Sequence, residues 1–126
     1  MTRPLVAVVD DDESVRESLP DLLRELGFAA TAFASADEFL SSEDITRTHC
    51  LLLDVCMPGM SGPELQQVLV SRGVRVPIIF ITARADVNVR ETLMQRGAAA
   101  FLSKPFSELQ LRQAFDAALR QTGDSR

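Results

Sequence analysis

Five short apolar segments recur along the chain and alternate with stretches of helical periodicity, and this alternation restricts the possible folds more than any other feature. The segments are Leu5–Val9, Ala29–Phe33, Cys50–Leu53, Pro77–Ile81 and Ala99–Leu102. Each is almost continuously apolar, as expected of parallel strands that are covered on both faces. Successive segments begin about 20–30 residues apart, which leaves room for one helical crossover between each pair of strands.

The stretches between these segments carry helix signals. The first helical run ends at Gly27, a residue type that is common just after a helix C-terminus. Pro63 and Ser107 each stand at the start of a further helical run, and both residue types are favoured at helix N-termini. Further helices are expected around Phe39 and over Asp86–Arg96. Five strand–helix units with right-handed crossovers predict one doubly wound α/β domain with a parallel sheet. A closed barrel would need eight such units and about twice the length.

One residue conflicts with this pattern. Pro20 falls inside the first helical run, where it cannot donate a hydrogen bond to the carbonyl of Arg16. We therefore expect a kinked or shortened helix, with a local irregularity near residues 16–20.

Composition and charge exclude several classes of protein. The 126 residues suit one domain, and 46 % apolar residues are enough for a core. The net charge of −5 argues against binding of a nucleic-acid backbone by this domain. No apolar run approaches the ~20 residues that span a bilayer, and the N-terminus shows no secretory pattern. We expect a cytoplasmic location without membrane contact, and we interpret residues 121–126 as a polar tail or the start of a linker.

The two cysteines do not indicate a disulfide framework or a zinc site. Cys50 and Cys56 are accompanied by a single histidine, too few ligands for structural zinc, and the apolar content removes the need for a disulfide. We expect Cys50 to be a small buried apolar residue.

Polar side chains follow four of the predicted strands. Asp10 and Asp11 follow the first strand, Asp54 the third, Thr82 the fourth and Lys104 the fifth. Because the carboxyl ends of parallel strands lie at one edge of a sheet, where ligands bind, these groups should converge. Lys104 is also the only lysine among 13 basic residues, and its ammonium is a compact point charge.

Three converging carboxylates repel one another, by about 4 kcal/mol per pair at ~4 Å and an effective dielectric near 20. A hard cation such as Mg²⁺ (or Mn²⁺) offsets this repulsion, and an ammonium offsets more of it. Taken singly, each residue has a simpler interpretation: acids at a helix N-terminus, a turn aspartate, a loop hydroxyl or a surface lysine. Their joint occurrence at four strand ends favours an oxygen-rich site for a metal ion and a phosphoryl group.

The chain resembles the receiver domain of two-component response regulators, and within that group the FixJ type. The resemblance covers residues 5 to about 120 and rests on four segments: Val8-Val-Asp-Asp-Asp12, Leu53-Asp-Val-Cys-Met-Pro-Gly-Met-Ser-Gly62, Ile81-Thr-Ala-Arg84 and Gly97-Ala-Ala-Ala-Phe-Leu-Ser-Lys-Pro-Phe106. It implies that residues 1–126 are a receiver domain. It also implies a flavodoxin/CheY-like fold with five helices and a five-stranded sheet in the order 2-1-3-4-5.

The resemblance implies a role for each acid of the site. Asp54 would accept the phosphoryl group. Asp11 would bind the metal ion directly, and Asp10 would act largely through water. The backbone carbonyl of Cys56 would complete the protein ligands of Mg²⁺ (or Mn²⁺).

It also implies the parts of a switch. Thr82 would move its hydroxyl toward the phosphoryl group, and the ring of Phe101 would swing inward with it; a plain core phenylalanine is the alternative. Lys104 would contact the phosphoryl oxygens, and its peptide bond to Pro105 would be cis.

Two positions depart from the usual pattern of the family or vary within it. Cys56 replaces a more common polar or charged residue, and Arg84 stands two residues after Thr82. Both would flank the phosphoryl group, where they would influence how long it survives hydrolysis, in a direction that the residue types leave open.

The implied function is a signalling switch rather than an enzyme with a turnover substrate. A partner histidine kinase would phosphorylate Asp54, and the domain would assist its own phosphorylation and dephosphorylation. The surface of the fourth helix, fifth strand and fifth helix would then change, allow a homodimer and control an output, with transcription as the expected process. Val89, Leu93 and Met94 cannot all face inward, which supports pairing through the fourth helix.

Two alternatives remain open. A receiver-like module could bind partners without phosphorylation, although none of the acids, the hydroxyl or the lysine is missing. An aspartyl-phosphate phosphotransferase or phosphatase of the haloacid-dehalogenase type would usually carry a second acid where Cys56 stands.

Overall fold

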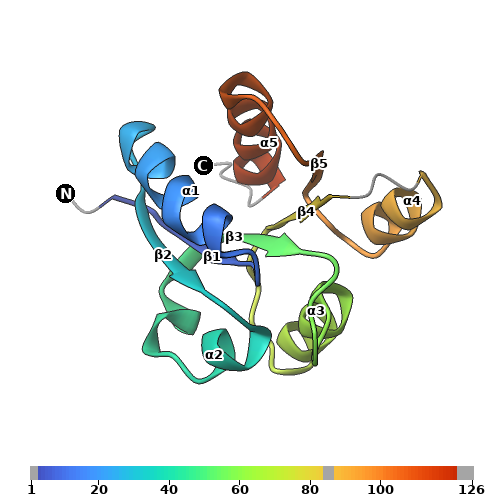
Figure 1. The fold of residues 1–126 in the computed structure, drawn as a ribbon. Helices are drawn as coiled ribbons and strands as arrows, with labels where there is room; N and C mark the ends of the chain where they lie inside the picture. Colours follow the sequence, from blue (N-terminus) through green and yellow to red (C-terminus); the bar gives the residue numbers. More distant parts are fainter. Residues whose placement is uncertain (1–2, 84–86, 122–126) are drawn as a thin grey trace.

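A five-stranded parallel sheet lies between two layers of helices in the computed structural model, which describes residues 3–83 and 87–121 (Figure 1). The strand order is β2-β1-β3-β4-β5, and every neighbouring pair is parallel. The strands are β1 (Leu5–Val9), β2 (Ala29–Phe33), β3 (Thr48–Asp54), β4 (Ile78–Thr82) and β5 (Ala100–Ser103). The predicted doubly wound sheet and its strand order are confirmed.

Four α-helices and one short 3₁₀ helix connect the strands, and a fifth α-helix follows β5. They are α1 (Glu13–Glu25), α2 (Ala36–Leu40), η1 (Glu43–Thr46), α3 (Gly62–Ser71), α4 (Val87–Gln95) and α5 (Glu108–Gln121). The sequence patterns predicted the five α-helices but not η1. The expected start of the fourth helix at Asp86 lies outside the described residues.

The core consists of two apolar layers, one on each face of the sheet. Alternate strand residues such as Val8 and Leu52 face α1 and α5, whereas Val9 and Leu53 face α2, α3 and α4. Figure 1 shows α1 and α5 on one side of the sheet and α2 and α3 on the other. This double cover explains why the strands are almost continuously apolar.

The predicted shortening at Pro20 does not occur, because α1 extends from Glu13 to Glu25 with the proline inside it. Pro20 is buried with Leu19 and Leu23, and packing of this face against the sheet holds the helix despite the lost backbone hydrogen bond. The helix begins at a strong cap, since the Asp12 side chain accepts a hydrogen bond from the backbone N–H of Ser14.

The structure also tests the predictions made for the cysteines and for the peptide bond before Pro105. Cys50 is buried, as predicted, and both cysteines are free thiols. The peptide bond between Lys104 and Pro105 is cis, also as predicted. Across the described ranges, every helix is too short or too polar to cross a membrane. The polar tail interpreted from residues 121–126 falls almost entirely outside the described chain.

Candidate functional site

An acidic cluster lies at the carboxyl edge of the sheet, where β1 and β3 run side by side. Asp10 directly follows β1, and Asp54 is the last residue of β3. Asp10 is completely buried and Asp54 is 5 % exposed, while Asp11 is exposed. One carboxylate oxygen from each of these three residues lies within 4.8 Å of the others. The structure therefore brings together the three acids that the sequence predicted to converge.

Lys104 extends from the end of β5 into this cluster. Its Nζ lies 2.8 Å from Asp10 Oδ2, and its backbone N–H donates to the carbonyl of Thr82 over 2.7 Å. Apart from this ion pair, Asp10 Oδ2 has no hydrogen-bond partner within residues 3–83 and 87–121. Asp10 Oδ1 accepts the backbone N–H of Asp12 over 2.9 Å. The buried Asp10 carboxylate is thus partnered on both oxygens, as a buried charge must be.

Thr82 ends β4 and is 4 % exposed. β4 runs beside β3, and Asp54 of β3 pairs with Ile81, the residue just before Thr82. Phe101 lies in β5 opposite Phe80, is half-buried, and packs against the apolar layer that includes α3 and α4. The structure places Thr82 at the edge of the acidic cluster and Phe101 in the sheet beside it.

The electrostatics of the cluster oppose ionisation of its central acid. Burial and, next, the charge of Asp10 raise the pKa of Asp54 to about 7, although Lys104 acts in the opposite direction. Burial alone would lower the pKa of Lys104, but the hydrogen bond and charge of Asp10, with Asp54 and Asp12, leave that pKa raised. The protein therefore holds Asp54 in surroundings that favour a further positive charge.

The loop after β3 folds back onto Asp54. The backbone N–H of Gly62 donates to the carbonyl of Val55 over 3.0 Å. A Cβ atom at Gly62 would lie 2.4 Å from the Asp54 carbonyl oxygen, so only glycine fits. In the sequence, Gly62 is recognisable only as the last residue of the segment Leu53–Gly62 that carries the family resemblance, because a close approach between backbones leaves no local pattern.

Of the two residues expected to flank the phosphoryl group, the structure describes only Cys56. The exposed Cys56 lies beside Asp54, and its backbone N–H makes a long 3.4 Å contact with Asp54 Oδ1. Arg84 lies outside the described residues.

An apolar groove adjoins the acidic cluster. It has a volume of about 720 Å³, and α1 and the loop after β5 line it with Val15, Leu19, Leu22, Pro105 and Phe106. Lys104 and Asp12 lie at its rim, so the groove is continuous with the site. The sequence alone does not predict this groove, because an apolar pattern does not show which residues of a helix or loop remain accessible.

Comparison with known proteins gives a family for this arrangement. Residues 6–116 match the model of the response regulator receiver domain. Nodulation protein W of Bradyrhizobium diazoefficiens is 44 % identical over 117 residues, which cover 93 % of this chain and 52 % of that protein. The transcriptional regulatory protein FixJ of Azorhizobium caulinodans is 40 % identical over 119 residues, which cover 94 % and 56 %.

Solved structures agree with these sequence relatives. The response regulator StyR superposes with a TM-score of 0.87 at 44 % identity, over 99 % of this chain and 63 % of that one. FixJ-N superposes with a TM-score of 0.83 at 36 % identity, over 95 % and 96 %. The chain spans about half the length of the curated relatives it matches. With its fold, its acidic cluster and its matched residues 6–116 taken together, this chain belongs to the response regulator receiver domain family.

Proposed function

We propose that this domain is a phosphorylation-controlled signalling switch in which Asp54 accepts the phosphoryl group. The observation that carries the proposal is the buried Asp54 carboxylate, clustered with Asp10 and Asp11 and faced by the ammonium of Lys104. Such surroundings are unfavourable for an isolated anion but suit an anion that reacts with phosphorus beside positive charge.

The proposed transfer needs few groups. An Asp54 carboxylate oxygen attacks the phosphorus of a phosphohistidine, a P–O bond forms, and the P–N bond breaks with its electron pair leaving on the imidazole nitrogen. Lys104 and the Thr82 hydroxyl stand at the ends of β5 and β4, where they can hold phosphoryl oxygens. Phe101 is proposed to change its packing when Thr82 moves.

The donor set fits Mg²⁺ (or Mn²⁺). Carboxylate oxygens from Asp10, Asp11 and Asp54 gather within 4.8 Å, and hard divalent cations prefer such oxygens. We assign direct binding to Asp11, Asp54 and the Cys56 carbonyl, with Asp10 acting through water. The bound cation would supply positive charge that neutralises the equatorial phosphoryl oxygens.

The phosphodonor partner is proposed to be a sensor histidine kinase that docks in the apolar groove beside Lys104. Any protein that delivers a phosphoryl group to Asp54 must contact the surface around the cluster, and this groove is continuous with it. Its apolar lining, with Val15 and Phe106 half-buried, would be covered by the partner.

Substituting Leu22→Glu should slow transfer from a kinase without slowing transfer from acetyl phosphate.

The output surface is proposed to be α4, β5 and α5. In α4, Leu93 is 2 % exposed whereas Met94 is 38 % exposed, so the apolar residues of this helix do divide between core and surface. We propose that two phosphorylated copies pair through α4 and β5 and control an output in transcription, the process that the transcriptional regulatory protein FixJ is named for. The acidic domain itself is not proposed to bind nucleic acid.

Light scattering with and without acetyl phosphate tests the pairing, with Met94→Asp as the variant expected to remain monomeric.

Intact mass spectrometry tests the central proposal. The protein is incubated with Mg²⁺ and acetyl phosphate; one phosphoryl group should add to the wild type and to Asp37→Asn, a matched change at an exposed acid of α2. Asp54→Asn should show no adduct. An undiminished adduct on that variant would reject Asp54 as the acceptor. No adduct on the wild type would favour a receiver module that works without phosphorylation.

A further inference from the structure

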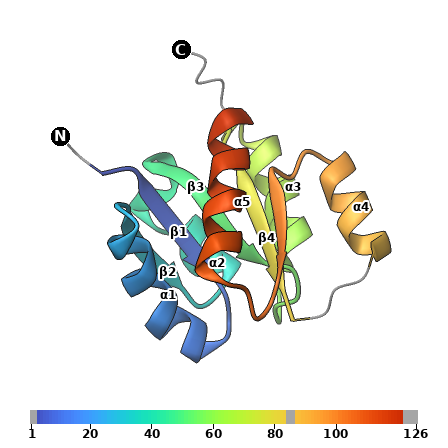
Figure 2. The same ribbon diagram turned by 90° about the horizontal axis from the view of Figure 1, so that it is seen from above.

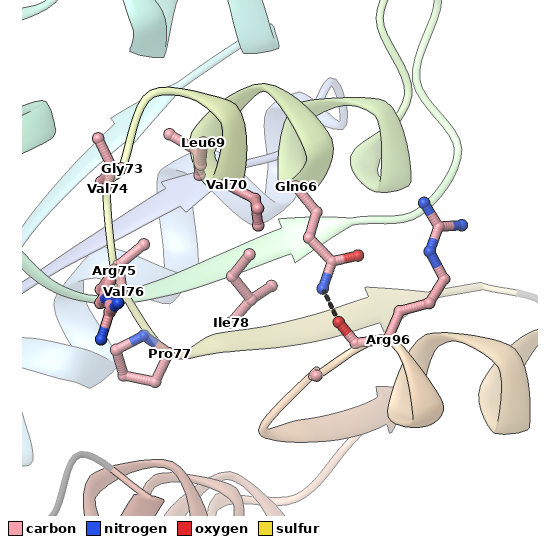
Figure 3. Close-up of a pocket in the computed structure, with 11 residues that line it drawn as sticks. Gln66, Leu69, Val70, Gly73, Val74, Arg75, Val76, Pro77, Ile78 and Arg96 are labelled. Atoms are coloured by element: carbon pink, nitrogen blue, oxygen red, sulfur yellow. Dashed lines mark hydrogen bonds between the residues drawn. The ribbon is translucent and has the colours of Figure 1, made fainter.

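A second pocket lies at the opposite edge of the sheet from Asp54. It has a volume of about 680 Å³, within the range of small-molecule sites. The end of α3, the loop before β4 and the turn that follows α4 form its walls (Figure 3). Figure 2 shows that the C-terminal end of α3 and the carboxyl ends of β4 and β5 lie at opposite edges of the molecule. The pocket is therefore separate from the acidic cluster.

One buried side chain in this pocket has an unused hydrogen-bonding atom. Gln66 is 5 % exposed, and its Nε2 donates to the backbone carbonyl of Arg96 over 3.2 Å. Because a carbonyl can only accept, this bond fixes which end of the amide is nitrogen. Gln66 Oε1 is buried and has no hydrogen-bond donor in the part of the chain that the structure describes. A buried acceptor without a partner is unfavourable, so a ligand that brought a donor to this atom would gain a hydrogen bond that the protein itself does not supply.

Positive charge and apolar surface line the same pocket as this acceptor. Arg75 and Arg96 line the pocket, and neither guanidinium forms an ion pair within the described residues. No described acidic residue lines the pocket, although the whole chain carries a net charge of −5. Figure 3 shows Gln66 Oε1 on the side of the amide where the Arg96 side chain lies, with Val70 and Ile78 on the other side. Val70 is 71 % exposed, unusually open for a valine on a helix.

We propose that this pocket binds a small organic anion that carries a hydroxyl or N–H donor next to its carboxylate and an apolar body beyond it. The donor bonds to Gln66 Oε1, the carboxylate lies near Arg96, and the apolar body covers Val70 and Ile78. A bare inorganic anion would satisfy the arginines but leave Oε1 and the apolar wall unused. The proposal goes beyond the phosphorylation switch and does not depend on it.

A matched pair of ligands tests this chemistry. 3-Phenyllactate and 3-phenylpropanoate differ by one hydroxyl next to the carboxylate, and sodium phosphate serves as an anion without an apolar body. Each is titrated into the ¹⁵N-labelled protein, and dissociation constants are taken from amide shifts. 3-Phenyllactate should saturate with shifts centred on Gln66, Val70 and Gly97. It should bind about tenfold more tightly than 3-phenylpropanoate, the effect of one buried hydrogen bond.

Variants separate the two polar contacts. Gln66→Leu should remove the preference for the hydroxylated ligand, whereas Gln113→Leu, the same change on the exposed surface of α5, should keep it. Arg96→Gln should weaken both organic anions severalfold. Arg90→Gln, the same charge change on α4 but away from the pocket, should leave binding unchanged.

Three results would overturn the proposal. They are equal affinity of the wild type for the two organic anions, shifts that centre on another part of the molecule, and no saturable binding. Phosphorylation of Gln66→Leu by acetyl phosphate is measured in parallel. A folded variant that is phosphorylated normally shows that loss of ligand preference is a property of the pocket, independent of the switch.

Discussion

Asp54 is held in surroundings that disfavour its own charge. Its pKa is raised to about 7 by burial and by Asp10, whereas the same side chain in an unfolded chain titrates near 4. Without metal, the folded state therefore binds more protons than the unfolded state between these values. The stability that this difference supplies is present below pH ~4 and is lost as the pH rises through ~7.

Asp54→Asn should consequently stabilise the metal-free protein at pH 8. After allowance for solvent screening, the expected gain in the free energy of unfolding is about 2 kcal/mol at pH 8, and it should largely vanish near pH 4.5. Urea unfolding in the presence of a chelator measures it, with Asp37→Asn as the control. A gain of the same size at both pH values would contradict the electrostatic explanation.

Lys104 and Arg112 offer a comparison of two ion pairs within one protein. Lys104 lies 2.8 Å from the completely buried Asp10, whereas Arg112 lies 3.1 Å from Glu108 with both side chains largely exposed. Lys104→Met should cost about 3 kcal/mol of stability without metal, because it leaves a buried carboxylate unpaired. Arg112→Met should cost less than about 1 kcal/mol. Chemical denaturation of both variants compares them, and equal losses would show that the buried ammonium has no special structural role.

Among the secondary-structure elements, α3 begins under a close steric constraint next to the site. Gly62 begins the helix, and a capping box between Ser61 and Glu64 holds the first turn. The Asp54 carbonyl would lie 2.4 Å from an added Cβ at Gly62, and a backbone atom cannot move aside as a flexible side chain can.

Gly62→Ala should therefore destabilise the protein by about 3 kcal/mol and slow phosphorylation, because the loop is displaced from Asp54. Gly59→Ala is the matched control in the same loop: its Cβ would meet open space, so only its φ of 76° opposes the change. Its cost should be about 1 kcal/mol. Thermal unfolding and the rate of acetyl phosphate transfer measure both variants, and the prediction fails if Gly59→Ala is the more damaging of the two.

At the scale of the whole molecule, the repulsion among the acids should couple metal binding to folding. Only the folded chain gathers Asp10, Asp11 and Asp54, so Mg²⁺ should bind the folded state preferentially. At a hundredfold excess over its dissociation constant, the ion should add about 2.7 kcal/mol of stability and raise the melting temperature by about 10 °C.

A thermal melt with increasing Mg²⁺ checks this coupling. Asp11→Asn should remove most of the increase while leaving the metal-free protein folded, because Asp11 is exposed. Asp37→Asn should retain it. The same increase in wild type and Asp11→Asn would place the ion elsewhere.

Much of this protein could be predicted from its sequence, because the controlling signals are local. Apolar continuity marks buried parallel strands, helical periodicity marks the crossovers, and residues that follow strands must meet at one edge of the sheet. The convergence of Asp10, Asp11, Asp54 and Lys104 followed from these rules alone. The unbroken helix through Pro20 did not follow, because burial of Leu19 and Leu23 outweighs a local penalty.

Only the tertiary structure decided the features that depend on contacts between distant segments. The chain order does not reveal that Gly62 touches the Asp54 carbonyl, or that Lys104 pairs with Asp10. Nor does it reveal that Gln66 is buried with one bond made to Arg96 and one acceptor unused. Periodicity tells which face of an element is covered, but distances between side chains arise when separate elements pack together. The raised pKa of Asp54 is likewise a property of the folded cluster rather than of the aspartate itself.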